Sequence, residues 1–342
     1  MTTTTMPRRA PAGSDFAALA RRIAEEGLME RRPAYYVGRL IAVAAMLVGG
    51  WAAFFLIGSS WWQLVTAAFL AVTFTQVALV AHDLAHRQVF RTRRPSEFCG
   101  RVAGTLIGMS YGWWVDKHTR HHNNPNHDDL DPDVAPEVLI WAANSAIGRR
   151  GLKGFVTRHQ AALFFPLLTL LALDLKVSSV KALRNPAVKR PGLEAALLVL
   201  HVVGYVAALL IVLSPLQALA FALVHQALFG VYLGMTFAPN HKGMPHPVGD
   251  EDFLRKQVLT SRNVRGGRLV EVATGGLNYQ IEHHLFPAMP SPSLRRAQPI
   301  VQAYCAEIGV SYEQTGLIAS YRQALEYLHE VGAPARAAHA AR

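Results

Sequence analysis

Two long segments of this 342-residue chain contain no Asp, Glu, Lys or Arg, namely residues 41–81 and residues 195–240. A helix that crosses a bilayer needs about 20 apolar residues, so each segment is long enough for two crossings. Turn residues interrupt each segment, as Gly58-Ser59-Ser60 and as Ser214-Pro215. We therefore expect two helical hairpins, with spans at about residues 40–57, 61–81, 195–213 and 216–238.

Composition and charge agree with a membrane protein. Hydrophobic residues make up 51% of the chain and charged residues 17%, against roughly 25% charged in soluble domains. All 34 Lys and Arg lie at or before Arg39, between Arg87 and Arg190, or after Asn240, so both hairpin tips lack them. Basic residues accumulate in cytoplasmic loops, which places both termini and the middle segment in the cytoplasm. A large soluble all-helical protein with buried hairpins is the less favoured alternative.

The rest of the chain divides around these spans. Residues 1–14 are low in complexity and are predicted to form a disordered tail. Residues 15–38 contain "DFAALARRIAEEGLMER", which reads as a capped amphipathic lead-in on the cytoplasmic side. Residues 39–332 are predicted to form one membrane domain that ends in a cytoplasmic helical cap, and residues 333–342 a C-terminal tail.

Two shorter apolar runs, residues 102–115 and 161–173, are too short to span and are predicted to lie in the membrane interface. Glycines recur every four residues around the first run, and we expect them to line one helix face. They are Gly100, Gly104, Gly108 and Gly112. Such a face serves close helix packing; the alternative is a groove that admits a lipid chain.

Eight of the fifteen histidines form four clusters near the cytoplasmic ends of spans or in cytoplasmic segments. They are His82, His86, His118, His121, His122, His241, His283 and His284. Offsets of three and four residues place side chains on one helix face, although any single cluster is a weak signal. Imidazole binds zinc, copper, iron and nickel, and eight histidines are too many for one zinc. Two metal ions with three to five nitrogen ligands each would use the whole set, and two nitrogen-ligated irons suggest dioxygen activation.

The clusters "HDLAH", "HTRHH" and "QIEHH" resemble, in order and approximate spacing, the three histidine boxes of the membrane fatty acid desaturases. The match extends over roughly residues 15–331. The form "QIEHHLFP" is similar to the acyl-lipid and front-end group and to related bacterial acyl-CoA desaturases. The resemblance implies an all-α integral membrane protein with four transmembrane helices in two hairpins, interfacial helices and a cytoplasmic helical cap that holds a di-iron site.

The same resemblance implies which residues bind iron. The seven histidines of the boxes would be ligands, and His241 matches an additional ligand that the family has outside the boxes. Gln280 occupies the position where many desaturases have a histidine. We expect Gln280 to lie near an iron through its amide oxygen or a bridging water, and Asn240 to hold a water or a metal.

Further residues are candidates for supporting roles. Four carboxylates could accept the free ring N–H of ligating histidines: Asp83, Glu282, Asp131 and Asp133. Five residues are candidates for the wall of an acyl channel: Tyr111, Trp113, Trp114, Gly104 and Gly108.

Desaturation explains why such a metal site is needed. No group near an unactivated CH2–CH2 pair acidifies its C–H bonds, so acid or base side chains cannot remove the two hydrogens. Dioxygen serves as co-substrate and is reduced to water by two electrons from the substrate and two from a donor. The protein supplies ligand geometry and a dry channel that selects the reacting carbons.

The resemblance also bears on partners. Front-end desaturases often carry a fused cytochrome b5 domain with a His-Pro-Gly-Gly motif, whereas only "HPVG" occurs here, at residues 246–249. We therefore expect a separate electron donor, such as a ferredoxin with its reductase. The net charge of +11 suits anionic lipid and an acidic donor. A fatty acyl-CoA or a membrane lipid is the expected substrate, and we expect no nucleic-acid partner. The 27 Arg against 7 Lys resemble a GC-rich bacterial genome, which favours a bacterial plasma membrane.

Three other functions compete with this interpretation. A fatty acyl or lipid hydroxylase or ketolase could use the same di-iron centre. A metal transporter would need polar ligands near the membrane midplane, whereas these histidines gather at one side. A zinc protease could use "HDLAH", but Asp83 replaces the glutamate of the H-E-x-x-H motif.

Overall fold

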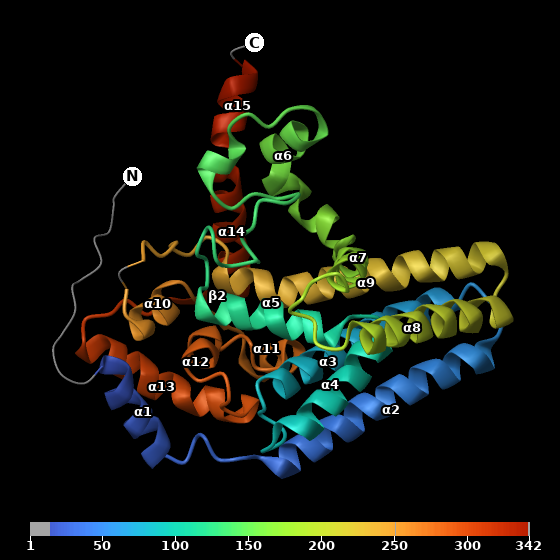
Figure 1. Ribbon diagram of the computed structural model, residues 1–342, viewed down its shortest axis with the longest axis horizontal. Coiled ribbons are helices and arrows are strands. Elements are labelled where there is room, and N and C mark those ends of the chain that lie inside the picture. The colour runs from blue at the N-terminus through green and yellow to red at the C-terminus, as the bar shows by residue number, and fades with distance from the viewer. Residues whose placement is uncertain (1–13, 250, 341–342) are drawn as a thin grey trace.

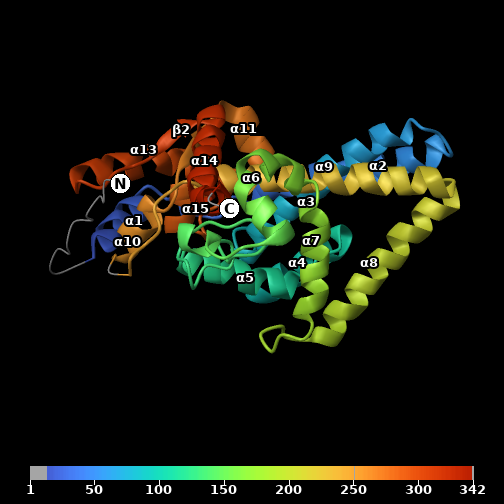
Figure 2. The same ribbon diagram turned by 90° about the horizontal axis from the view of Figure 1, so that it is seen from above.

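The computed structural model describes residues 14–249 and 251–340 and is mostly helical. Four helices of this described part are long and apolar enough to cross a membrane, in agreement with the predicted number. They are α2 (Pro33–Ile57), α3 (Gln63–Ala85), α8 (Pro191–Val212) and α9 (Pro215–His241). Helix α3 packs against both α2 and α9, whereas α8 meets α9 at their shared turn and then diverges from it (Figure 2).

The spanning helices extend beyond the predicted spans. Helix α2 begins at Pro33 instead of about residue 40, and α3 and α9 continue to Ala85 and His241. Hydropathy marks only the part of a helix that lies in lipid, whereas hydrogen bonding carries the helix on through polar residues. Because of these extensions, His82 lies in the last turn of α3 and His241 is the last residue of α9. The spanning helices therefore carry both histidines.

The run at residues 102–115 does not form one interfacial helix. Helix α4 (Arg93–Ile107) ends at Gly108, whose φ of +74° is a left-handed conformation that suits glycine. Helix α5 (Tyr111–Asn123) starts after Ser110, whose side chain accepts a hydrogen bond from the backbone N–H of Trp113. The prediction that the four glycines line one helix face is therefore wrong, because the chain reverses at Gly108.

The second short run, residues 161–173, is also divided between two helices. Helix α6 (Gly151–Leu168) is followed by α7 (Leu171–Ala182), and the chain bends by 86° between them. As a pair they are long and apolar enough to count as a further, broken span. Helix α7 packs against α9, so this bent segment lies beside the spanning helices.

The remaining elements gather at one end of the spanning helices (Figure 1). We call the assembly of α1, α10 to α15 and the two strands the cap. Its elements are α1 (Asp15–Glu25), α10 (Phe253–Leu259), β1 (Asn263–Arg265), α11 (Gly267–Thr274), α12 (Gln280–Leu285), α13 (Ser291–Glu307), β2 (Gln314–Gly316), α14 (Leu317–Val331) and α15 (Ala333–Ala340). A short 3-10 helix, η1 (Ala143–Ala146), lies against α15. Strands β1 and β2 pair in parallel.

The core of the cap joins α1 to α13, two helices far apart in the sequence. Leu19 and Ile23 of α1 are fully buried and belong to one apolar cluster with Leu294 and Val301 of α13. Helix α1 starts as predicted, because the Ser14 side chain accepts a hydrogen bond from the backbone N–H of Ala17. Apart from Ser14, the predicted N-terminal tail lies outside the described residues, and residues 333–340 of the predicted C-terminal tail are helical.

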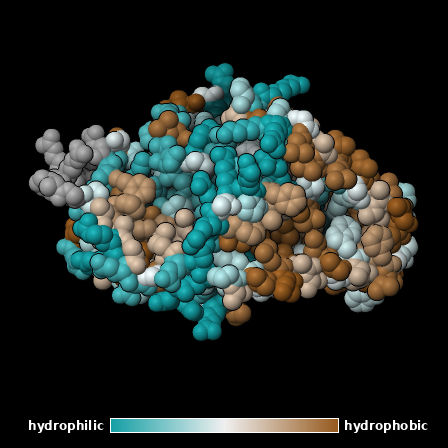
Figure 3. All heavy atoms as spheres, turned by 60° about the horizontal axis from the view of Figure 1, so that its bottom comes forward, coloured by the Kyte–Doolittle hydropathy of each residue, from teal (hydrophilic) through white to brown (hydrophobic). Residues whose placement is uncertain are grey.

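Hydropathy separates the two ends of the molecule. Figure 3 shows apolar residues covering the end formed by the spanning helices, next to a band of hydrophilic residues. The exposed apolar residues include Val48 of α2 and Ile211 of α8, at 69% and 79% exposure. In water such a surface would be costly at about 25 cal/mol per Å². The chain is therefore a membrane protein in which this surface faces lipid.

Candidate metal centre

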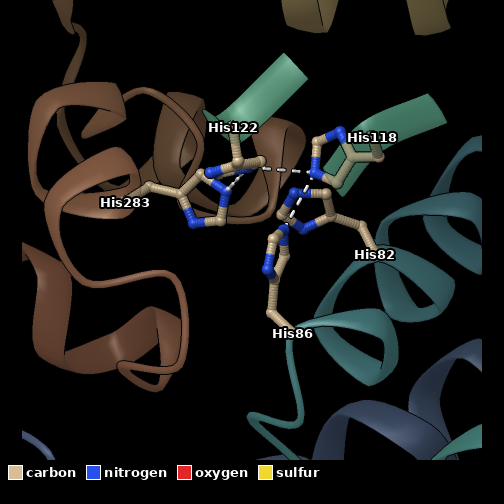
Figure 4. Close-up of side chains that lie close together, drawn as sticks. All are labelled: His82, His86, His118, His122 and His283. Atoms are coloured by element: carbon tan, nitrogen blue, oxygen red, sulfur yellow. Dashed lines mark hydrogen bonds between the residues drawn. The ribbon is translucent and has the colours of Figure 1, made fainter. Parts of the chain in front are cut away.

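The eight histidines singled out in the sequence come together where α3, α5, α9 and α12 meet, and they sort into two groups. The five-histidine group consists of His82, His86, His118, His122 and His283 (Figure 4). The three-histidine group consists of His121, His241 and His284. Within each group, one ring nitrogen of every residue lies within 4.8 Å of the others. Both groups therefore have the spacing of a candidate metal site.

Helix geometry explains how one short motif serves both groups. His118 and His122 are one turn apart on α5 and point to the five-histidine group, whereas His121 is turned about 100° from His122 and points to the other. On α12 the neighbours His283 and His284 diverge in the same way. The H-x-x-H-H spacing thus supplies ligand-type nitrogens to two adjacent positions.

The ring nitrogens of the five-histidine group are close enough together to bind a transition-metal ion that prefers nitrogen ligands. The Nε2 atoms of His86 and His118 are 2.8 Å apart, and those of His122 and His118 are 3.1 Å apart. The Nε2 atom of His82 is buried and has no hydrogen-bond partner among the described residues. An unpartnered buried nitrogen is costly, and a metal ion would satisfy it. This set of donors fits iron or another imidazole-binding metal.

Burial also sets the protonation state of these rings. It lowers the pKa of His86, His118, His122, His283 and His284 well below the usual histidine range, and the neighbouring histidines lower it further. These five imidazoles are therefore neutral at physiological pH. Neutral imidazole carries the lone pair that a metal accepts.

The three-histidine group is completed by two amides. The Nε2 atoms of His241 and His284 are 3.0 Å apart, and Gln280 Nε2 lies 2.9 Å from His241 Nε2. Asn240 donates a hydrogen bond to Gln280 Oε1 at 3.2 Å and two more to backbone carbonyls. Both amides are buried. The structure thus places Gln280 and Asn240 beside the group with fewer histidines.

The second ring nitrogen of several histidines is held by a fixed acceptor. His241 Nδ1 lies 3.0 Å from the carbonyl oxygen of Thr260, which can only accept, so Nδ1 carries the proton and Nε2 keeps its lone pair. His121 Nδ1 lies 2.9 Å from Asp131 Oδ2. His284 Nδ1 lies 2.9 Å from Gln257 Oε1. Two further contacts are longer: Asp83 lies 3.4 Å from His82 and Asp133 3.5 Å from His121. Asp83, Asp131 and Asp133 are three of the four carboxylates that the sequence suggested as partners of histidine rings.

Gln257 and Thr260 are contacts that the sequence did not reveal. Gln257 is fully buried on α10 and also donates a hydrogen bond to the backbone carbonyl of His122, at 2.9 Å. It therefore links the last turn of α5 to His284. No local spacing signals this role, because the residues meet only through the tertiary fold.

Two lysines balance the carboxylates beside the three-histidine group. Lys117 forms an ion pair with Asp133, and Lys242 donates a hydrogen bond to the Asp133 carbonyl oxygen at 3.0 Å. Burial by itself would raise the pKa of Asp133, but the nearby positive charges of Lys117 and Lys242 lower it below its usual range. Asp133 is therefore ionised and contributes negative charge beside the ring of His121.

The interpretation of Glu282 as a partner of a histidine ring is corrected by the structure. Its carboxylate accepts hydrogen bonds from Asn263 and Tyr312, both at 2.7 Å. On a helix, adjacent residues point about 100° apart, so Glu282 faces β1 when His283 faces the histidines. Burial raises the pKa of Glu282 to about 7. Glu282 holds α12 against β1 and does not contact the histidine groups.

The five candidate channel residues have different surroundings. Tyr111 is buried and fills the space over Gly100 and Gly104, where an added Cβ would lie 2.1 Å and 3.2 Å from its side chain. An added Cβ at Gly108 would lie 2.4 Å from the ring of His201. Trp113 packs in the same apolar cluster as Tyr111. Trp114 stacks on His118, with ring centroids 4.6 Å apart, and is the candidate that borders the histidines.

Comparisons with known proteins place these features in a family. A model of the fatty acid desaturase family matches residues 59–316. Acyl-lipid (9-3)-desaturase of Physcomitrium patens is 30% identical over 339 residues, which cover 95% of this chain and 64% of the moss protein. Fatty acid desaturase 3 of Bos taurus is 32% identical over 314 residues, covering 87% and 68%. Acyl-lipid 8-desaturase of Rebecca salina is 31% identical over 346 residues, covering 95% and 76%.

The chain thus spans roughly two thirds to three quarters of the length of these relatives. The family match covers most of the chain and includes all eight clustered histidines. Together with the apolar spanning helices, it identifies the chain as a member of the fatty acid desaturase family.

Proposed function

We propose that the chain is an oxygen-dependent membrane desaturase that introduces a cis double bond into a fatty acyl chain carried on CoA or on a lipid. The observation that carries this proposal is the division of eight histidines, seven buried and His86 half-buried, into two adjacent groups at one end of the spanning helices. Names of the relatives, acyl-lipid desaturase and fatty acid desaturase, support the reaction class.

Each group would hold one iron. His82, His86, His118, His122 and His283 would hold the first, and His121, His241 and His284 the second. When bound, the two irons would activate dioxygen and supply the oxidant for C–H cleavage. The protein residues hold the rings: Asp131, Thr260 and Gln257 each keep a proton on Nδ1 of a histidine and leave Nε2 available.

Gln280 would give the second iron a weaker contact than a histidine gives. Its amide lies against His241, and a half-turn of that amide would bring Oε1 to the position that Nε2 has. Asn240 is close enough to hold a water there. An amide oxygen binds iron less strongly than imidazole does. We propose that this leaves a more open coordination position on the second iron.

Trp114 and burial keep the site dry. The Trp114 ring covers His118, and five of the eight histidines are at most 5% exposed. Excluding water protects the reacting carbons from side reactions. Tyr111, Trp113, Gly104 and Gly108 are proposed to shape the acyl path only through the packing of α4 on α5.

Orientation and electron supply are further parts of the proposal. We propose that α2 with α3 and α8 with α9 form two hairpins, and that the cap, the histidines and both termini lie in the cytoplasm of a bacterial cell. The whole of residues 39–332 would act as one domain. A separate donor, such as a ferredoxin with its reductase, would bring two electrons, and the net charge of +11 suits an acidic carrier.

Expression in a host that lacks the activity tests the proposal. Lipids are extracted and new double bonds are mapped by mass spectrometry. A new alkene supports desaturation, and its position and carrier identify the substrate. A hydroxylated product without a new alkene would assign the chain to the hydroxylases instead. Metal analysis of the purified protein gives an independent test: zinc alone, or one metal ion per chain, contradicts the two-iron centre.

A further inference from the structure

Helix α11 carries an apolar face that no other part of the described chain covers. Leu269 is 86% exposed and Val272 70% exposed, and α11 contains no buried residue. The two side chains are three residues apart and therefore lie on the same side of the helix. Large apolar side chains exposed in pairs on an amphipathic helix are typical of a membrane-surface helix.

The end of α11 is fixed to the spanning helices. The carbonyl oxygen of Ala273 accepts hydrogen bonds from Tyr232 on α9, at 2.8 Å, and from Gln76 on α3, at 3.3 Å. Both donors lie within their spans, and Gln76 precedes His82 by less than two turns of α3. Helix α11 therefore sits at the depth where the spanning helices pass into the cap, as Figure 1 also shows.

The neighbouring helix α2 indicates where the bilayer surface lies relative to α11. An added Cβ at Gly275, directly after α11, would lie 2.8 Å from the guanidinium of Arg39. Arg39 lies between the exposed apolar residues Val37 and Ile41 of α2, which are 56% and 65% exposed. The apolar face of α11 is thus level with the first lipid-facing residues of a spanning helix.

We propose that α11 is an interfacial anchor that lies in the headgroup region of the bilayer and inserts Leu269 and Val272 among the acyl chains. Arg265, the last residue of β1, and Arg268, in the first turn of α11, are exposed and reach the phosphates of the headgroups. The occupant of this surface is lipid, because the surface continues the apolar belt of α2. The inference concerns membrane attachment and holds whatever reaction the histidine groups carry out.

This anchor is connected to the candidate metal centre by a very short segment. Gly275 and Gly276, with φ of +64° and +88°, turn the chain directly from α11 towards Gln280 and α12. In the same segment, the buried Asn278 side chain donates a hydrogen bond to the backbone carbonyl of Val264 in β1, at 3.3 Å. Insertion of α11 therefore fixes the height of α12, with Gln280, His283 and His284, relative to the bilayer surface.

Site-directed spin labelling of the full chain tests the proposal. Cys99→Ser removes the partly exposed native thiol, while Cys305 is fully buried and unreactive. A nitroxide is attached at Val272→Cys, at Val248→Cys in the loop after α9, and at Val48→Cys on α2. All three valines are well exposed, at 70%, 83% and 69%, so labelling leaves the core intact. The protein is placed in nanodiscs of phosphatidylcholine and phosphatidylglycerol.

Relaxation by dissolved oxygen is compared with relaxation by a water-soluble nickel chelate at each site. The proposal predicts a severalfold higher oxygen-to-nickel ratio at Val272→Cys than at Val248→Cys, shifted in the direction of Val48→Cys. Equal ratios at Val272→Cys and Val248→Cys would overturn it, because α11 would then face water. Protection of Val272→Cys from both reagents would overturn it too, since a protein partner or a second copy would cover the helix.

Discussion

The two histidine groups share two short motifs, "HTRHH" and "QIEHH", yet they differ in how they are completed. The five-histidine group contains only imidazoles. The three-histidine group has Gln280 and Asn240 at its edge, together with Asp131 and Asp133 behind His121. One group is therefore rich in strong nitrogen donors, and the other combines fewer such donors with two amides. The difference indicates two positions with unequal tasks.

This contrast gives a reason for the glutamine in "QIEHH". A histidine at position 280 would make the groups more alike in donor number. Gln280 keeps them different while preserving a polar contact to His241.

The largest effect is expected when a ring is removed from the smaller group. His284→Ala leaves two histidines there, whereas His86→Ala leaves four in the larger group. We expect His284→Ala to abolish desaturation and to lower iron from about two to about one per chain, while His86→Ala retains more iron. Iron is measured by plasma mass spectrometry. His329→Ala, at an exposed position on α14, is the control. Equal iron loss in His86→Ala and His284→Ala would contradict the unequal groups.

Removal of the Gln257 side chain should have the next largest effect. Gln257→Leu deletes the acceptor of His284 Nδ1 and the bond to the His122 carbonyl. Loss of such an outer partner typically costs about 10–100-fold in metal affinity or activity. Iron retention is measured by titration with a chelator. Gln302→Leu, exposed on α13, should leave retention unchanged. Unchanged retention in Gln257→Leu would show that His284 is positioned by its own helix alone.

Substitution of Gln280 should change turnover more than iron content. Gln280→His adds an imidazole to the three-histidine group, so both irons should be retained while activity changes. The rate of alkene formation and the iron content are measured on the same preparation. If Gln280→Ala left both quantities untouched, Gln280 would be only a structural neighbour of His241.

The smallest effect on the metal groups is expected from the packing of α4. Gly100→Ala places a Cβ 2.1 Å from the Tyr111 ring at the start of α5. Overpacking of this kind costs about 1–3 kcal/mol, so thermal unfolding in detergent should shift to lower temperature. Helix α5 supplies histidines to both groups, so a small shift of α5 would affect both groups alike. The division of iron between the two groups should therefore not change. Gly204→Ala on α8, where an added Cβ meets no atom within 4 Å, serves as control.

The spans and the histidines were accessible to sequence reasoning because both signals are local. An uncharged run of twenty residues is enough to predict a spanning helix. Histidines three and four residues apart are enough to predict that they share a helix face. The prediction of four spans agrees with α2, α3, α8 and α9. The grouping of His118 with His122 but not with His121 needed the three-dimensional meeting of α3, α5, α9 and α12.

What the sequence did not predict depends on long-range contacts or on a single backbone angle. Gln257 contacts His284 from α10, and Thr260 contacts His241 through its backbone oxygen. A backbone contact does not depend on the type of residue, so the sequence does not indicate it. Glu282 sits next to two histidines in sequence but faces away from them. The left-handed conformation of Gly108 divides a run that looks like one helix. Helix α11 is too short to stand out by hydropathy.

The five-histidine group draws its members from residues as far apart as His82 and His283. Contacts between such distant parts of a chain form late, because a long loop must close first. During synthesis, α3 and α5 emerge well before α12 does, so their histidines wait without partners. The site is thus complete only after nearly the whole chain has left the ribosome. A nascent chain stalled before Gln280 should insert its spans yet retain less iron than the full chain, because it lacks His283 of one group and His284 of the other.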